Sequence, residues 1–266
     1  MNWEKKYRQF QKRWKQGKYK NATRTISACA ATACVVLLGV YFFQGRESED
    51  RIDNLRSEKE AALANSGAEG LDTIRAQGDE MLVQYEELHA ENPDLVGWLT
   101  IDGTSVDYPI MYTPDDPEYY SRRGFDKKKS NNGLLFMDEA SNMYDYGGNV
   151  IIYGHNMKNG SMFADLMKYK DEEYWTEHPA IRMDTLHESR VYEITSVVVS
   201  SDLSALPFDF VSPEDEVAEE VIQTMEDNAL YDTGVDAKYG DDFLTLSTCD
   251  YDEDDGRLVV MARRIQ

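Results

Sequence analysis

The stretch Phe243-Leu-Thr-Leu-Ser-Thr-Cys249 is a short run of apolar and hydroxyl-bearing residues that ends in a cysteine. Such a run is typical of a buried β-strand. The stretch Asn149-Val-Ile-Ile-Tyr-Gly-His155 has the same character and ends in a histidine, and Arg257 begins a third strand-like run. Each reactive side chain is therefore predicted at a strand end, where rigid scaffold meets loop. We expect the three to converge on one rim of the fold.

Strand-like runs broken by turn residues continue from Asp94 to the end of the sequence. Asp102-Gly103, between the first two runs, is a strong hairpin signal. The number and irregular spacing of the runs favour a mainly β fold with a closed barrel over a parallel α/β sheet. The predicted strands cover residues 95–101, 105–111, 134–137, 149–153, 190–199, 243–248 and 257–265.

Two helices are predicted between these strands. One is short and covers residues 161–169. The other begins at Ser212, because Ser212 can cap it, Pro213 suits the first helical position, and Asp215 adds an acid to the first turn.

Charge is distributed very unevenly along the 266 residues. Residues 1–24 carry nine lysines and arginines against Glu4 alone, and residues 26–43 carry no charge. The net charge is +8 before this run and −30 after it. An apolar helix of this length can nearly span a bilayer, and its basic flank is expected to stay cytoplasmic. A cleaved signal peptide and a buried core helix are the alternatives, but the aromatic end of the run and the charge reversal favour an uncleaved anchor.

The sequence therefore predicts four parts. These are a basic cytoplasmic tail (1–24), a transmembrane signal anchor (25–43), an extracellular linker with a helix (44–71) and a catalytic domain (72–266). The protein is expected in the cell membrane with a single pass. Residues 47–64 are expected to form a mobile polar helix, whereas a second helix over residues 74–88 is expected to pack on the domain.

Three cysteines refine this prediction. Cys29 and Cys34 fall inside the predicted anchor, so Cys249 is the only thiol of the exported domain and has no intramolecular partner for a disulfide. An unpaired thiol outside the cell is a liability unless the sulfur is needed. A buried structural cysteine remains the alternative at this point.

Cysteine, histidine and arginine together suit acyl transfer. A thiolate is a nucleophile, a histidine can take up the thiol proton and later protonate a leaving amine, and a guanidinium can stabilise an oxyanion. We expect His155 and Arg257 to have these roles, assisted by a backbone N–H near Asp250. The five acids of loop 250–256 disfavour a thiolate at Cys249, which makes a cationic partner more necessary. Taken singly, however, a histidine such as His155 is more often a structural residue in a turn, and an arginine such as Arg257 is usually a solvated or salt-bridged surface residue.

Two segments resemble the sortase family. Leu244-Thr-Leu-Ser-Thr-Cys249, followed by Arg257, is similar to the sortase cysteine strand, and Asn149-Val-Ile-Ile-Tyr-Gly-His-Asn156 is similar to the histidine segment. The resemblance covers roughly residues 92–265. The runs Val96-Gly-Trp-Leu-Thr-Ile101, Asp107-Tyr-Pro-Ile110 and Leu135-Phe-Met-Asp138, with the helix after Ser212, resemble class B.

The resemblance implies an eight-stranded sortase-type β-barrel with peripheral helices and the catalytic residues His155, Cys249 and Arg257. It implies cleavage of a C-terminal sorting signal after Thr and transfer of the acyl group to an amine of the peptidoglycan precursor, so that secreted proteins of a Gram-positive bacterium become anchored to the wall. Ser247 matches a position that lines the substrate groove. Where class B members often have Leu-Asn after a tyrosine, this chain has Ser121-Arg122.

The acceptor remains open, because a pilin-polymerising sortase would use a pilin lysine and a plain cysteine hydrolase would use water. A non-catalytic anchored binding domain is the remote alternative. No phosphate loop, dinucleotide fingerprint or basic nucleic-acid patch occurs, so neither a cofactor nor a nucleic-acid partner is expected. Loop 250–256 lacks the spacing of an EF-hand, and no metal is expected.

Overall fold

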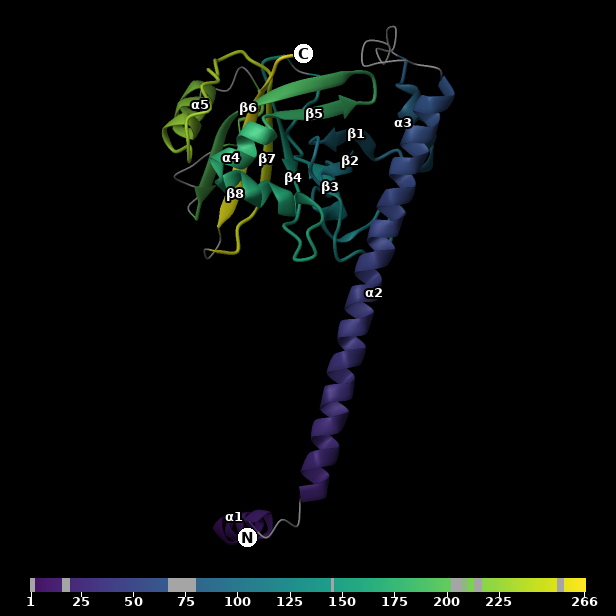
Figure 1. Ribbon diagram of the computed structural model, residues 1–266, viewed down its shortest axis with the longest axis vertical. Coiled ribbons are helices and arrows are strands. Elements are labelled where there is room, and N and C mark those ends of the chain that lie inside the picture. The colour runs from purple at the N-terminus through teal and green to yellow at the C-terminus, as the bar shows by residue number, and fades with distance from the viewer. Residues whose placement is uncertain are drawn as a thin grey trace. The chain divides into compact units, whose positions relative to one another are not determined.

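The computed structural model describes residues 3–15, 20–66, 80–144, 146–201, 208, 210–212, 217–252 and 256–266. The chain divides into two compact units, Met1–Glu47 and Ser48–Gln266. Figure 1 shows the strands gathered in the second unit.

The first unit contains α1 (Trp3–Lys15) and the beginning of α2 (Lys20–Ser66). The anchor predicted over residues 25–43 falls within α2. Among the residues that the structure describes, none of the helices has both the length and the apolar character needed to cross a bilayer.

The second unit is a closed β-barrel, as predicted. Going round the barrel, the strands follow the order β1-β2-β3-β4-β7-β8-β6-β5. Their bounds are β1 Leu95–Thr100, β2 Asp107–Met111, β3 Leu135–Met137, β4 Asn149–Tyr153, β5 Ala180–Thr185, β6 Ser189–Ser200, β7 Phe243–Cys249 and β8 Arg257–Arg264.

Seven of the eight strands lie where the sequence predicted them, and β5 was missed. This strand is buried on alternate residues, with Ile181 and Met183 inside and Arg182 and Asp184 partly exposed. Its alternation is the period-two signal of a half-buried strand. Arg182 and Asp184 interrupt the apolar residues of β5, so alternation is the local sequence signal that marks this strand.

Strand pairing sets the positions of the reactive residues. β4 and β7 run parallel, with Tyr153 opposite Ser247, so both strands end at the same rim. β8 returns antiparallel to β7, with Cys249 opposite Arg257. Because His155 follows Tyr153 by two residues and Cys249 follows Ser247 by two, this register brings all three together.

The strands that carry the site are buried on both faces. One face of β4, β7 and β8 points into the barrel core, where the side chains of Ile152, Leu246 and Val260 are fully buried. The other face packs under α5 (Ala218–Asp227), which buries Val221, Ile222 and Met225. Burial on both faces explains why β4 and β8 have apolar residues in succession, while β7 combines apolar residues with buried threonine and serine.

The remaining helices are short. They are α3 (Val83–Glu91), η2 (Tyr119–Arg122), η3 (Phe163–Lys170) and α4 (Glu172–Glu177). The helix predicted over 161–169 corresponds to η3, which is a 3-10 helix. α3 packs as expected, with Tyr85 and Leu88 buried, although part of the predicted segment lies outside the described residues. The predicted helix start at Pro213 and Asp215 also lies outside them.

The prediction of a mobile helix at residues 47–64 was wrong. The second unit begins at Ser48, and the C-terminal part of α2 within it buries Ile52 and Leu55. Lys59 Nζ lies 2.9 Å from Asp107 Oδ1 on β2 and 4.2 Å from the centre of the Trp98 ring. Burial would raise the pKa of Asp107, but the charge of Lys59 holds this pKa below its usual value. Residues 48–66, assigned to a linker from sequence, are therefore part of the barrel unit.

Leu55→Ala should measure how much this packing stabilises the barrel. Leu55 is 0% exposed, so the variant leaves a cavity and should lower the free energy of unfolding by about 2–4 kcal/mol. Leu63→Ala, on the same helix at a partly exposed position, is the matched control and should cost less. Denaturant unfolding of both variants, followed by near-UV circular dichroism, checks this. Equal losses would contradict the packing of residues 48–66.

Candidate active site

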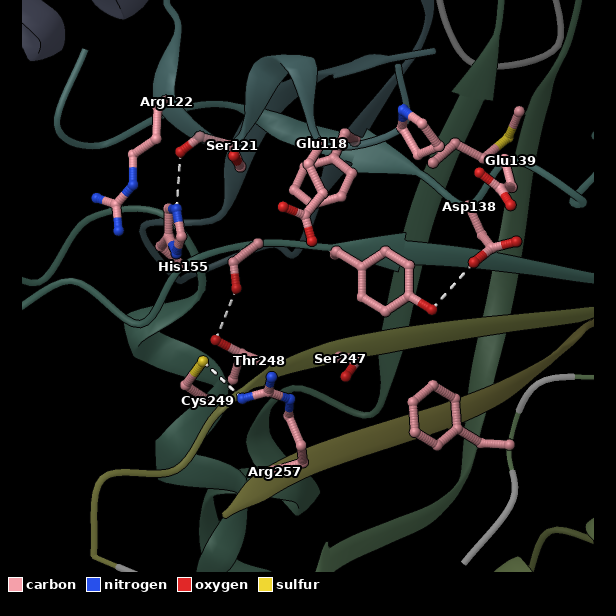
Figure 2. A pocket seen from close by; sticks show the side chains of 16 residues that line it. Glu118, Ser121, Arg122, Asp138, Glu139, His155, Ser247, Thr248, Cys249 and Arg257 are labelled. Carbon is pink, nitrogen blue, oxygen red and sulfur yellow. Dashed lines mark hydrogen bonds between the residues drawn. The ribbon is translucent and has the colours of Figure 1, made fainter. Parts of the chain in front are cut away.

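The three predicted residues line one cleft of about 610 Å³ at the rim of the barrel. Figure 2 shows Cys249 and Arg257 on one wall and His155 on the other. The cleft is lined by Pro117, Glu118, Ser121, Arg122, Phe136, Met137, Asp138, Glu139, Tyr153, Gly154, His155, Phe208, Ser247, Thr248, Cys249 and Arg257. The geometric prediction that sulfur, imidazole and guanidinium share a cleft is confirmed.

Arg257 contacts the sulfur directly. Its Nη1 donates a hydrogen bond to Cys249 Sγ over 2.8 Å. The two residues are opposite each other across β7 and β8, so the register fixes this pairing. A guanidinium has five N–H donors, and one bond to sulfur leaves others for a substrate oxygen.

The hydrogen bond of His155 defines its tautomer. His155 Nε2 lies 2.8 Å from the carbonyl oxygen of Ser121 in η2. A carbonyl oxygen only accepts, so Nε2 carries a hydrogen and Nδ1 is the nitrogen left to exchange a proton. In Figure 2 this second ring nitrogen is on the side of the ring toward Cys249.

Burial favours the neutral form of His155. Loss of hydration lowers the pKa of this imidazole below its usual value, and the positive charge of Arg122 lowers this pKa further. The bond to Ser121 and the charge of Glu118 act in the opposite direction but do not outweigh burial. At neutral pH the ring is therefore mainly unprotonated at Nδ1 and can accept a proton.

The ends of β4 and β7 are joined by polar contacts that sequence reasoning did not predict. Thr248 Oγ1 donates to the Gly154 carbonyl over 2.8 Å, and Asn156 Nδ2 donates to the Cys249 carbonyl over 3.1 Å. Asn156 and Thr248 stand in the two quoted segments, so their presence was visible, but their partners were not. These bonds fix the loop of His155 relative to the strand of Cys249.

Gly154 is favoured by close packing. A Cβ atom at this position would lie 2.5 Å from Leu135 Cδ2 and 2.6 Å from Phe163 Cδ2. A side chain at this position would force the buried side chains of Leu135 and Phe163 to shift, so close packing favours glycine where the chain turns from β4 to His155.

The expectation of a free backbone N–H near Asp250 was wrong for Asp250 itself. Its N–H donates to the Gly256 carbonyl over 2.8 Å. The acidic loop is also partly neutralised, because Lys170 Nζ lies 2.6 Å from Asp250 Oδ2 and 2.9 Å from Asp252 Oδ2. Both carboxylates raise the pKa of Lys170 against the opposing effect of desolvation. The negative charge beside Cys249 is thus smaller than the sequence suggested.

Ser247 lines the cleft, as its predicted substrate-side position requires. It is 3% exposed, and within the described part of the chain its hydroxyl has no hydrogen-bond partner. Ser121 and Arg122, where class B often has Leu-Asn, also line the cleft. Ser121 also contributes its carbonyl oxygen to the hydrogen bond with His155.

Two charge-removing variants should shift the pKa of His155 in opposite directions. Arg122→Gln removes a positive charge and should raise this pKa, whereas Glu118→Gln removes a negative charge and should lower it. An NMR titration of the His155 ring in each variant measures both shifts. A shift of the same sign in both variants would contradict the assigned electrostatics.

Comparison with known proteins agrees with this architecture. Residues 99–265, more than half of the chain, match the family model of the sortase domain. The Sortase B of Listeria monocytogenes is 32% identical over 246 residues, which cover 87% of this chain and 94% of that protein.

Solved structures give the same result. Sortase B from Bacillus anthracis in complex with AAEK1 has a TM-score of 0.72 and 29% identity, over 85% of this chain and 99% of that one. Clostridium perfringens sortase B has a TM-score of 0.62 and 32% identity, over 68% and 99%. The chain therefore belongs to the sortase family of cysteine transpeptidases and, within it, to class B.

Proposed function

We propose that this sortase cleaves a C-terminal sorting signal after Thr and transfers the acyl group to an amine of the peptidoglycan precursor, which anchors secreted proteins to the cell wall. The observation that carries the proposal is the 2.8 Å contact of Arg257 with the Cys249 sulfur, in a cleft that His155 also lines. The expected roles are Cys249 as nucleophile, His155 as proton carrier and Arg257 as oxyanion ligand.

The first half of the reaction forms a thioester. Nδ1 of neutral His155 accepts the thiol proton, and the thiolate of Cys249 attacks the Thr carbonyl carbon. The negative charge that develops on the carbonyl oxygen is stabilised by the guanidinium of Arg257. The C–N bond then breaks, and the imidazolium gives its proton to the leaving amine.

The second half transfers the acyl group. The acceptor amine attacks the thioester carbon and loses a proton to His155, while the Cys249 thiolate leaves. The reaction exchanges one amide bond for another, because the new amide to the acceptor amine replaces the amide bond that was cleaved after Thr. This exchange needs no cofactor. Ser247 is assigned to the substrate wall because it lines the cleft and its hydroxyl has no hydrogen-bond partner among the described residues.

The proposed location is the outer face of the cell membrane, with the N-terminus cytoplasmic. It is supported by the charge-free run at residues 26–43 and the nine basic residues before it. At that location the catalytic domain would meet both of its substrates, which are the wall precursor and the secreted proteins with sorting signals.

The test uses the full chain in detergent with a library of peptides that contain Thr-Gly or Thr-Asn, with and without amine acceptors. Mass spectrometry should detect a thioacyl adduct on Cys249 that accumulates without amine and is discharged into a new amide when amine is added. Cleavage that is equally fast without amine would favour a hydrolase. Preference for a lysine-bearing pilin fragment over wall-precursor amines would favour pilin polymerisation.

A further inference from the structure

The N-terminal helix α1 has an aromatic face. Trp3, Tyr7, Phe10 and Trp14 are spaced by four, three and four residues, which at about 100° per residue places them within an arc of about 60°. They are 76%, 52%, 49% and 54% exposed. The rings of Phe10 and Trp14 lie 5.9 Å apart, centre to centre, as expected for neighbours on one face.

The rest of the α1 surface is basic. Lys5, Arg8 and Lys12 lie on the side opposite the aromatic residues, while Lys6 and Arg13 border the aromatic face. Each of these side chains is exposed, and Glu4 is the only acid of the helix. Long basic side chains at such a border can extend past apolar neighbours to reach anionic groups.

A helix with this surface needs a partner. An isolated helix of 13 residues is marginally stable in water, and every described side chain from Trp3 to Trp14 is exposed. Tryptophan and tyrosine favour the interface between lipid and water, and lysine and arginine favour anionic headgroups. The aromatic face of α1 therefore suits the lipid–water interface, and the basic residues at its border suit anionic headgroups.

We propose that α1 binds along the surface of a membrane that contains anionic lipids, with its aromatic face in the headgroup region and the bordering residues Lys6 and Arg13 against lipid phosphates. A second copy of α1 is a poorer partner, because pairing would bring two strongly basic helices together. The proposal is separate from the chemistry of the barrel cleft. It also does not require that α2 crosses the bilayer.

The test compares the full chain in vesicles of phosphatidylcholine with the full chain in vesicles of phosphatidylcholine and phosphatidylglycerol. Hydrogen exchange of the amides of residues 3–15, followed by mass spectrometry, should be at least about tenfold slower in the anionic vesicles, because several basic residues contribute to binding. Raising the salt concentration should reduce this difference.

Two sets of variants separate lipid binding from helix propensity. The triple variant Trp3→Ser, Phe10→Ser and Trp14→Ser should lose the protection, although serine has a helix propensity close to that of the residues it replaces. The matched control Gln9→Ser and Gln11→Ser, outside the aromatic face, should keep it. Lys6→Gln with Arg13→Gln should reduce the difference between the two kinds of vesicle.

Three results would overturn the proposal. Equal exchange in neutral and anionic vesicles would exclude an electrostatic lipid site. Protection that survives in the aromatic variant would exclude the aromatic face, and protection that rises with the protein-to-lipid ratio in neutral vesicles would indicate contact between copies. Peptide cleavage measured in the same samples reports the cleft separately, so loss of one function is distinguishable from loss of the other.

Discussion

Cys249→Ala is expected to reduce cleavage of a sorting-signal peptide by at least about 10⁴-fold, to the background rate, because removal of a nucleophile removes the covalent route. Cys249 is partly exposed at the end of β7, and its side chain bonds only to Arg257 among the described contacts. The variant should therefore fold, with a melting temperature close to that of the parent. Turnover and thermal unfolding of the same preparation measure both expectations.

The chain offers a matched control for this variant. Cys29 and Cys34 are thiols outside the cleft, so a variant with both replaced by alanine should keep parental turnover. Peptide mass analysis should find the thioacyl adduct in this control and none in Cys249→Ala. Parental cleavage by Cys249→Ala would return the cysteine to a structural role and remove the proposed mechanism.

The strands that hold the site were predictable because they are buried on both faces. β4 and β8 have apolar residues in succession, and β7 combines apolar residues with small hydroxyl-bearing ones, so all three have a strand-like composition that is a strong local signal. The position of a cysteine, a histidine and an arginine at their ends followed directly from the sequence. β5 carries Arg182 and Asp184 on its outer side and was missed for that reason.

The contacts that tune the site depend on tertiary packing and were not predictable. The Ser121 carbonyl reaches His155 from 34 positions earlier in the chain, and Lys170 reaches Asp250 across 80 residues. Neither partner is marked by local spacing or periodicity. The parallel pairing of β4 with β7 is likewise a long-range choice, and it determines which strand ends meet.

The packing of residues 48–66 shows the same limit. Their composition is that of a polar, solvated helix, and only Ile52 and Leu55 are fully buried. Its ionic contacts to β2 are those of Arg56 and Lys59 with Asp107, which is 51 and 48 positions away from them. A local pattern therefore predicted the helix correctly but not what it packs against.

Arg257→Lys is expected to lower turnover by about 10²–10³-fold, with a smaller change in KM, if Arg257 stabilises the oxyanion. Lysine keeps the positive charge but loses the planar fork, so it cannot contact the Cys249 sulfur and a substrate oxygen in the same fixed geometry. Arg263→Lys, at the far end of β8 and outside the cleft, is the matched control and should retain parental turnover. Steady-state kinetics with one sorting-signal peptide compare the three proteins.

Alkylation of Cys249 separates the two contributions of Arg257. Iodoacetamide reacts with the thiolate and needs no oxyanion ligand, so its rate reports only how well the cation supports charge on the sulfur. Because lysine preserves that charge, alkylation of Arg257→Lys should fall far less than peptide turnover. An equal fall in both rates would mean that Arg257 acts on the Cys249 sulfur alone. Near-parental turnover would mean that Arg257 has a structural role only, through its pairing with Cys249 across β7 and β8.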